Sequence, residues 1–167
     1  MLASTCLFTL LSILGVSVTA SPIAEHHSLA KRYSGVKIRS GRNGLCLTPT
    51  GPWREGMHVG TLGCDIGAKW DINPGSGSVI LHGYNLALDA GTGNTNNELL
   101  KLWTPYPGLF QQTWYLTDDN RIAITGGNQC LDEAEGGPQT YQCTSGNANQ
   151  VWYIVESPPE ANMTTFA

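Results

Sequence analysis

The amino-acid sequence predicts an all-β fold built from three pseudo-symmetric repeats. Its 167 residues include 20 glycines and 9 prolines without a fixed period, which is typical of a chain rich in turns. Segments of similar sequence begin near Cys46, Ala87 and Cys130, roughly forty residues apart. Each repeat closes on a tryptophan, at Trp70, Trp114 and Trp152. A hydrophobic share of 41 % at this length suits one globular core.

Short apolar runs predict about four strands in each repeat. Val79 to Leu81 and Arg121 to Ile124 are two such runs, bounded by turns rich in Gly, Asn and Asp. The segment from Glu98 to Trp103 could begin a helix by propensity alone. It lies in register with residues 60–64 and 139–143, where glycine and β-formers dominate, so we interpret it as a strand.

Residues 1–20 have the features of a signal peptide. Leu7 to Val18 is nearly all apolar, is too short to span a bilayer, and is followed by the small residue Ala20. Residues 21–32 are polar and end in the dibasic pair Lys31-Arg32, which predicts a pro-segment; a merely solvated charge pair is the alternative. The predicted domain then covers residues 33–156.

The charge of the chain argues against a nucleic-acid partner. The 9 basic and 13 acidic residues become seven and twelve once Lys31, Arg32 and Glu25 are removed with residues 1–32, which gives a net charge of −5. Phosphate binding needs a basic surface. No stretch after residue 32 is apolar enough to insert into a membrane, so we predict a soluble, secreted, extracellular product. The sequence leaves the oligomeric state open.

Four of the five cysteines remain once Cys6 is assigned to the signal peptide. An oxidising compartment favours disulfides among these four, Cys46, Cys64, Cys130 and Cys143. Four cysteines allow three pairings, and the count alone does not choose among them.

Two repeats have a glutamine two residues before the closing tryptophan, in Gln112-Thr113-Trp114 and Gln150-Val151-Trp152. With the opening Cys130-Leu131-Asp132, these motifs resemble the ricin B-chain, or QxW, lectin family over about residues 36–155. The resemblance implies a β-trefoil fold. A buried glutamine amide can tie a strand to neighbouring backbone, because it donates and accepts at once. The first repeat departs from the pattern, with Ala68 at the glutamine position.

The resemblance also implies disulfides within repeats, joining Cys46 to Cys64 and Cys130 to Cys143. The second repeat has Ala87 and about Pro105 at the matching places. Pairing between repeats is the alternative.

By the same resemblance each repeat can carry a shallow sugar site, and the third repeat matches that pattern best. A carboxylate accepts hydrogen bonds from two sugar hydroxyls, amides complement them, and an aromatic ring covers the apolar face of the sugar. The third repeat offers Asp132, Gln139, Tyr141, Asn149 and Gln150. The alternatives are a turn-capping role for Asp132, edge packing for Tyr141 and a structural role for Gln150.

The second repeat matches in part, with Asp89, Lys101, Trp103 and Gln112. Alternation along residues 100–103 sends two leucines inward and leaves Lys101 and Trp103 facing out. Asp89 could instead cap a turn, and Trp103 could anchor a loop. The first repeat has Thr48 in place of the aspartate and Leu62 in place of the aromatic, so no sugar site is expected there.

The sequence contains no motif typical of an enzyme, a metal site or a cofactor site. The histidines after residue 32 are His58 and His82, and both are expected at the surface. Glu133 and Glu135 follow Asp132, but glycoside hydrolysis needs two carboxyls that face each other across a cleft. We therefore predict a solvated acidic loop.

The function predicted from the sequence is that of a non-enzymatic lectin that recognises galactose-type or related glycans, mainly through the third repeat. A secreted β-trefoil protein-interaction module, such as a protease inhibitor, is the alternative. Sugar-site residues at repeat spacing favour the lectin. Asn162 begins the only N-glycosylation sequon, within residues 157–167, which are predicted to form a disordered tail.

Overall fold

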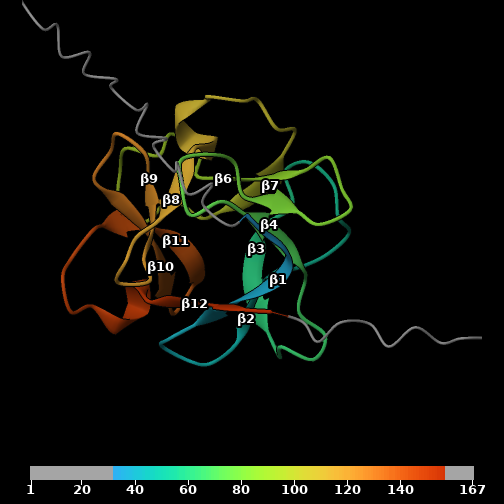
Figure 1. The fold of residues 1–167 in the computed structure, drawn as a ribbon, viewed down its shortest axis with the longest axis horizontal. Coiled ribbons are helices and arrows are strands. Elements are labelled where there is room, and N and C mark those ends of the chain that lie inside the picture. Colours follow the sequence, from blue (N-terminus) through green and yellow to red (C-terminus); the bar gives the residue numbers. More distant parts are fainter. Residues whose placement is uncertain (1–31, 157–167) are drawn as a thin grey trace, which may run out of the picture.

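The structure is a computed structural model that describes residues 32–156. Within this range the chain forms twelve strands and two short 3₁₀ helices (Figure 1). In chain order these are β1 Tyr33–Ser40, β2 Cys46–Pro49, β3 Val59–Leu62, β4 Trp70–Ile72, β5 Ile80–Leu81, β6 Ala87–Asp89, β7 Lys101–Trp103, η1 Phe110–Gln112, β8 Trp114–Leu116, β9 Ile122–Ile124, β10 Gln129–Ala134, β11 Gly137–Gln142, η2 Ala148–Gln150 and β12 Trp152–Val155. Neither helix in this range could cross a membrane. The predicted signal peptide, residues 21–31 of the pro-segment, and the tail with Asn162 lie outside the described residues.

Each of three units contributes four strands, as the sequence predicts. The first unit holds β1 to β4, the second β5 to β8 and the third β9 to β12. In every unit the middle two strands form an antiparallel hairpin, β2–β3, β6–β7 or β10–β11. Neighbouring units are joined where β4 pairs with β5 and β8 pairs with β9. The architecture is the β-trefoil that the sequence predicts.

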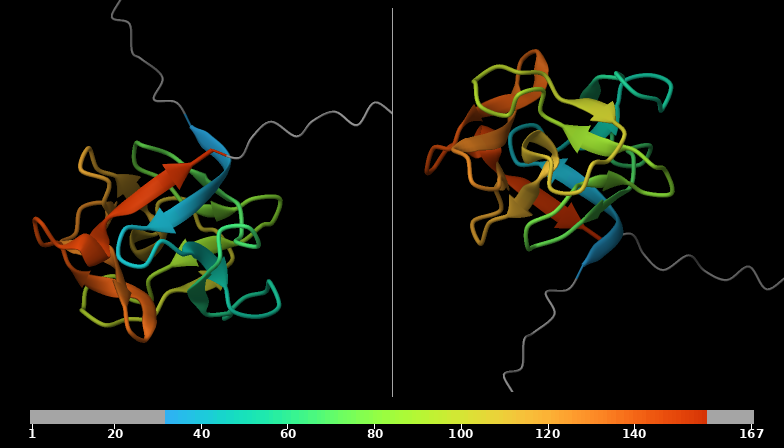
Figure 2. Two further views of the ribbon diagram at one scale, coloured as in Figure 1. Left: turned by 90° about the horizontal axis from the view of Figure 1, so that it is seen from below. Right: turned by 90° about the horizontal axis from the view of Figure 1, so that it is seen from above.

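The first and last strands close the fold. β1 and β12 lie side by side and antiparallel (Figure 2), from Lys37 opposite Val155 to Ser40 opposite Trp152. On its other edge β1 pairs with β4 of its own unit. The first strand therefore binds the first unit to the third, and residues from opposite ends of the sequence become neighbours.

The three hairpins share one register, which fixes the correspondence between units. Opposite one another lie Cys46 and Leu62, Ala87 and Trp103, and Cys130 and Tyr141. Further along each hairpin, the corresponding cross-strand pairs are Thr48 with Gly60, Asp89 with Lys101, and Asp132 with Gln139. The register of the repeats predicted from the sequence is confirmed at each of these positions.

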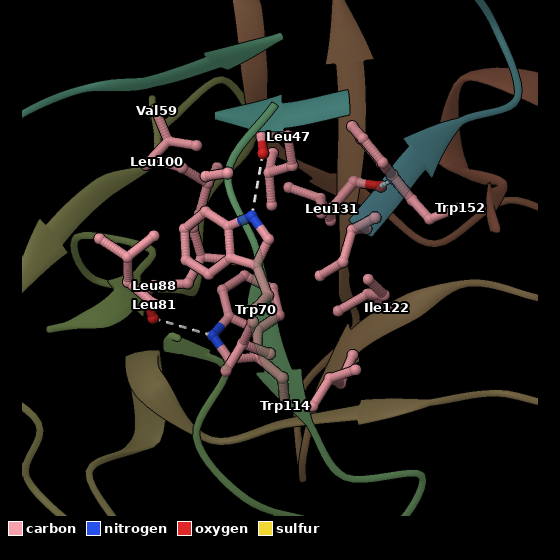
Figure 3. Packing of buried hydrophobic residues seen from close by; sticks show 14 of the residues in the cluster. Leu47, Val59, Trp70, Leu81, Leu88, Leu100, Trp114, Ile122, Leu131 and Trp152 are labelled. Carbon is pink, nitrogen blue, oxygen red and sulfur yellow. Dashed lines mark hydrogen bonds between the residues drawn. The ribbon is translucent and has the colours of Figure 1, made fainter. Parts of the chain in front are cut away.

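The core is organised around three tryptophans, one from each unit (Figure 3). Trp70, Trp114 and Trp152 are at most 1 % exposed. Each indole Nε1 donates a hydrogen bond to a carbonyl of the hairpin in its own unit, at 2.9 Å to Leu47, 3.1 Å to Leu88 and 2.9 Å to Leu131. The large apolar rings supply the buried area, and the one polar atom of each ring is satisfied.

The glutamines of the QxW motifs are buried and bond to the backbone, as predicted. Gln112 donates from Nε2 to the Thr104 carbonyl at 3.1 Å and accepts at Oε1 from the Tyr106 N–H at 2.8 Å. Gln150 bonds to its own unit in the same way, as described below. Ala68 has no side-chain amide, so the first unit lacks this tie.

Both disulfides expected within units are present. Cys46 bonds to Cys64 and Cys130 bonds to Cys143, with Cα atoms 4.9 and 5.0 Å apart. The other two pairings are thereby excluded. Each bridge spans a hairpin of its unit, and a bridge that closes a loop of this size stabilises by about 3 kcal/mol in the chain-entropy model.

The strand predicted from Glu98 to Trp103 is shorter than expected, because β7 begins at Lys101. Residues 97–100 instead run beside β11 of the third unit, where the Leu100 N–H donates to the Pro138 carbonyl at 3.1 Å. The Glu98 carboxylate turns back to accept from the Gly93 N–H at 3.2 Å. Contacts with the neighbouring unit, which the repeat does not encode, set the start of the strand.

The prediction of a solvated acidic loop after Asp132 is wrong for Glu133. Glu133 lies within β10 and is 3 % exposed, whereas Glu135 is exposed at the hairpin turn. Glu133 accepts hydrogen bonds from Asn43 and Thr61 of the first unit, which cover it. Both histidines, His58 and His82, are exposed as expected.

Candidate functional site

The third unit gathers four of its five predicted site residues around one surface cavity of about 390 Å³. Asp132 lies on β10, and Gln139 and Tyr141 lie on β11, on the same face of the hairpin because they are two residues apart. Asn149 comes from η2. The cavity is lined by Arg42, Asp132, Ala134, Glu135, Gln139, Tyr141, Asn147 and Asn149.

The Asp132 side chain is buried to 4 % exposure at the base of this arrangement. Its Oδ2 accepts a hydrogen bond from Asn147 Nδ2 at 3.2 Å. Burial raises the pKa of Asp132, while hydrogen bonds from Gln150 and Asn147 and the charge of Arg42 partly offset that rise. Within residues 32–156 no backbone N–H donates to Asp132, so the turn-capping alternative does not describe it. Its carboxylate is held by side chains and lines an open cavity.

Gln150 does not line the cavity and is fully buried beneath it. Its Oε1 accepts from the Thr144 N–H at 2.8 Å, and its Nε2 donates to the Gln142 carbonyl at 2.9 Å. It also forms a hydrogen bond with Asp132. Gln150 therefore orients the aspartate and fixes the loop between β11 and η2, which is the structural alternative raised from the sequence.

The short helix η2 positions Asn149. Asn147 caps this helix, since its Oδ1 accepts from the Asn149 N–H at 3.1 Å. The same Asn147 donates to Asp132, so one side chain connects the helix to the carboxylate. Asn149 is held at the rim of the cavity by this cap.

Tyr141 is 39 % exposed and lies beside the carboxylate on the same hairpin face. A ring in this position can present its face to a ligand in the cavity. Its counterparts in the other hairpins are Trp103, 37 % exposed, and Leu62, 43 % exposed. The outward direction predicted for this position in the second unit is confirmed.

Four of the residues that line the cavity were not predicted as site residues from the sequence: Arg42, Ala134, Glu135 and Asn147. Asn147 stands five positions before Trp152, and asparagine is one of the residues preferred as a helix N-cap. Arg42 belongs to the first unit and donates from Nη1 to the Glu133 carbonyl at 2.6 Å. Nothing in the repeat could have placed it here, because the contact depends on how the first and third units meet.

The second unit holds its aspartate differently. Asp89 is 3 % exposed, its Oδ1 accepts from the Gly91 N–H at 2.8 Å, and its Oδ2 accepts from Gln112 Nε2 at 2.9 Å. Lys101 Nζ lies 3.9 Å from Oδ1 and 5.0 Å from the centre of the Trp103 ring. Gly91 adopts φ +71°, the left-handed conformation that favours glycine, to complete this turn. The turn-capping alternative thus describes Asp89.

The first unit brings no carboxylate to the equivalent position. The Thr48 hydroxyl donates to the Cys46 carbonyl at 2.9 Å and accepts from the Ala68 N–H at 3.2 Å. Opposite it stands Gly60, which has no side chain. Within residues 32–156 no group of three or more His, Cys, Asp or Glu side chains could hold a metal ion.

Comparison with protein families agrees with this architecture. The model of the ricin-type beta-trefoil lectin domain matches residues 34–154. The chain therefore belongs to the ricin-type β-trefoil lectin domain family, a family of carbohydrate-binding domains. No curated protein sequence matches the chain.

Solved structures share the fold at low sequence identity. The designed threefold-symmetric protein ThreeFoil aligns with a TM-score of 0.63 and 18 % identity, over 73 % of this chain and 98 % of its own. The C-terminal half of an earthworm R-type lectin, in complex with GalNAc, aligns with a TM-score of 0.58 and 20 % identity, over 72 % of this chain and 96 % of its own. GalNAc-T7 with UDP, GalNAc and Mn²⁺ aligns with a TM-score of 0.54 and 20 % identity, over 71 % of this chain and 21 % of its own.

Proposed function

We propose that this protein is a lectin that binds galactose-type glycans through the cavity of the third unit. The observation that carries the proposal is the convergence of a buried, side-chain-held carboxylate, two amide side chains and an exposed ring at one cavity. These groups are Asp132, Gln139, Asn149 and Tyr141. A protein-interaction loop would need none of them.

The chemistry of these groups suits a pyranose. The Asp132 carboxylate would accept from two neighbouring hydroxyls in charge-assisted bonds, and Gln139 and Asn149 would each donate and accept at the remaining polar atoms. The Tyr141 ring would cover the apolar C–H face of the sugar. The earthworm lectin of the same fold is in complex with GalNAc, a galactose-type sugar, which supports a galactose-type ligand for this protein.

The second unit contributes little to this function. Three groups already engage Asp89, so a sugar hydroxyl would have to displace the Gly91 N–H, Gln112 or Lys101. Displacing a satisfied partner cancels most of the gain from a new hydrogen bond. The second unit therefore adds at most a weak contact through Trp103, which would matter only on a multivalent surface.

A glycan array followed by calorimetric titration tests the proposal. Wild type should bind free galactose-type sugars, and Asp132→Ala should weaken that binding by roughly tenfold or more, because it loses an acceptor for two hydroxyls. Asp89→Ala is the matched control and should bind the free sugar nearly as wild type does. If Asp132→Ala binds like wild type, the third-unit cavity is not the lectin site, and a protein-interaction module becomes the favoured function.

We also propose that the protein acts outside the cell. The two disulfides suit an oxidising compartment. The apolar run of residues 7–18 and the dibasic Lys31-Arg32 would direct secretion and maturation. N-terminal sequencing of the secreted product should give Tyr33, and mass spectrometry should find a glycan on Asn162; an intracellular, full-length product would contradict the proposal.

A further inference from the structure

The loop that precedes β7 in the second unit runs antiparallel to β11 of the third unit and bonds to its backbone. The Leu100 N–H donates to the Pro138 carbonyl at 3.1 Å, and the Thr140 N–H donates to the Glu98 carbonyl at 2.9 Å. The Asn97 N–H adds a third bond, to the Thr140 carbonyl at 2.7 Å. The loop therefore lies beside the β10–β11 hairpin as a short additional strand, next to the Asp132 cavity.

Two side chains fasten the same loop at its start. Thr140 Oγ1 donates to the Thr95 carbonyl at 2.8 Å, and Asn96 Oδ1 accepts from the Gln142 N–H at 2.8 Å. Backbone and side-chain bonds together hold the loop against β11 over several consecutive residues. Its outward side chains are thus placed relative to the third unit as firmly as those of the hairpin itself.

Leu99 of this loop lies directly opposite Gln139, one of the residues that line the cavity. The backbone bonds described above flank the two residues, which therefore form a non-hydrogen-bonded pair. Side chains of such a pair share one face of the sheet, with Cβ atoms about 5 Å apart. Gln139 in turn lies opposite Asp132. One row of side chains thus crosses three neighbouring strands, from Asp132 through Gln139 to Leu99.

The spacing of this row decides what can reach its far end. Neighbouring strands lie a little under 5 Å apart, so the strands of Asp132 and Leu99 are about 10 Å apart. A pyranose ring held by Asp132 is shorter than this, so only a group attached to the ring extends to Leu99. Leu99 is 47 % exposed and open to such a group. A single exposed leucine is ordinary on a protein surface, and the place of Leu99 at the end of this row is what distinguishes it.

The second unit has the same arrangement with different chemistry. His58 of the first unit lies opposite Lys101, as Leu99 of the second unit lies opposite Gln139. The row in the second unit consists of Asp89, Lys101 and His58, which are all polar. In both units the preceding unit supplies the last residue of the row, and only in the third unit is that residue apolar.

We propose that Leu99 is a specificity-determining residue of the third-unit sugar site, where it contacts a small apolar substituent of the sugar held by Asp132. The Leu99 side chain offers no hydrogen bond, so it favours a group that gains by leaving water. Two substituents have this chemistry, the methyl of an N-acetyl group and an apolar aglycone on the anomeric oxygen. The inference rests on the proposed function and deepens it by naming the substituent that the site prefers.

Calorimetry of the full chain with three sugars tests this role. Methyl β-galactoside is the reference, methyl N-acetyl-β-galactosaminide adds the N-acetyl group, and phenyl β-galactoside enlarges the aglycone. Wild type should bind at least one of the two substituted sugars about fourfold more tightly than the reference, the value of burying one methyl-sized group. The sugar that shows the gain identifies which of the two substituents lies at Leu99.

Three variants assign the gain to Leu99. Leu99→Ala removes the apolar contact and should bring the ratio of the two affinities, substituted sugar to reference, down to about one. Leu99→Met keeps a side chain of similar volume and should retain the wild-type ratio. Leu62→Ala is the matched control, because Leu62 is 43 % exposed on the hairpin of the first unit, and it should also retain that ratio. Thermal melts check that each variant is folded.

The role of Leu99 is overturned, and the Asp132 site stands, if wild type binds both substituted sugars no more tightly than the reference or if Leu99→Ala keeps the wild-type ratio. It is also overturned if Leu99→Ala weakens the binding of all three sugars by the same factor, since Leu99 would then support the site without selecting the ligand. If wild type binds none of the three sugars, the proposed function fails and the role of Leu99 fails with it.

Discussion

Asp132 lies directly opposite Gln139 on the β10–β11 hairpin, so a neutral amide faces the carboxylate across the strands. In the second unit the same pair is Asp89 and Lys101, and there the ammonium lies 3.9 Å from the carboxylate. Lys101 thus adds an ion pair to the hydrogen bonds that Asp89 accepts from Gly91 and Gln112, whereas Asp132 faces a neutral amide across the hairpin.

That difference gives the first prediction. Gln139→Lys should place a cation opposite Asp132 and lower the affinity for a galactose-type sugar by roughly tenfold or more, because the new ion pair competes with the sugar hydroxyls. Gln139→Ala removes one amide contact without adding a cation and should cost only about threefold to fivefold. Titration calorimetry of both variants compares them, and equal losses would show that the cation does not reach the carboxylate.

The raised pKa of Asp132 predicts that sugar binding weakens as the pH falls. Burial favours the protonated form, which cannot accept from two hydroxyls, so affinity should fall as the pH drops towards the raised pKa, above the ordinary aspartate value of about 4. Titrations from pH 7 to pH 4 should show this decline in wild type. Asp132→Asn should bind weakly with an affinity that changes little over the same range.

The raised pKa of Glu133 predicts a pH-dependent effect on stability. Burial raises this pKa, so the folded state holds the proton more tightly than the unfolded state does. Glu133 therefore contributes least to the free energy of unfolding at neutral pH, and its contribution rises as the pH falls towards the ordinary glutamate value. The free energy of unfolding of Glu133→Gln relative to wild type should be higher at pH 7 than at pH 4. A difference that is constant with pH would contradict this.

Gln150 should stabilise the third unit through its two backbone bonds. Gln150→Ala leaves the Thr144 N–H and the Gln142 carbonyl without partners and should lower the free energy of unfolding by about 2 kcal/mol in denaturant titrations. Gln142→Ala, which removes an exposed side chain and keeps that carbonyl bond, should change it by less than about 0.5 kcal/mol. Equal losses in the free energy of unfolding would mean that the buried Gln150 amide does not anchor the backbone.

The two disulfides should be equivalent for stability and different for binding. Replacing either pair of cysteines with serine should cost about 3 kcal/mol in the chain-entropy model. Only loss of the Cys130–Cys143 bridge should also weaken sugar binding, because it joins the hairpin of Asp132 to the loop that leads into η2. Loss of Cys46–Cys64 is the control.

Features that recur in each unit could be predicted from the sequence. The threefold register, the tryptophan anchors and both disulfides follow from spacing and from resemblance to a family, because the units pack around the core in the same way. Features formed where two units meet could not be predicted. Arg42 reaches the third-unit cavity from the first unit, and Glu133 is buried by Asn43 and Thr61 of that unit. The late start of β7 at Lys101 has the same cause, since residues 97–100 run beside a strand of the next unit.

The most direct test of the proposed sugar site is a two-dimensional NMR titration of the full chain with methyl β-galactoside. We expect saturable shifts of the Asp132, Tyr141 and Asn149 amides, with the Asp89 and Trp103 amides unchanged. Shifts confined to the second unit, or no saturable shift anywhere, would contradict sugar binding at the Asp132 cavity.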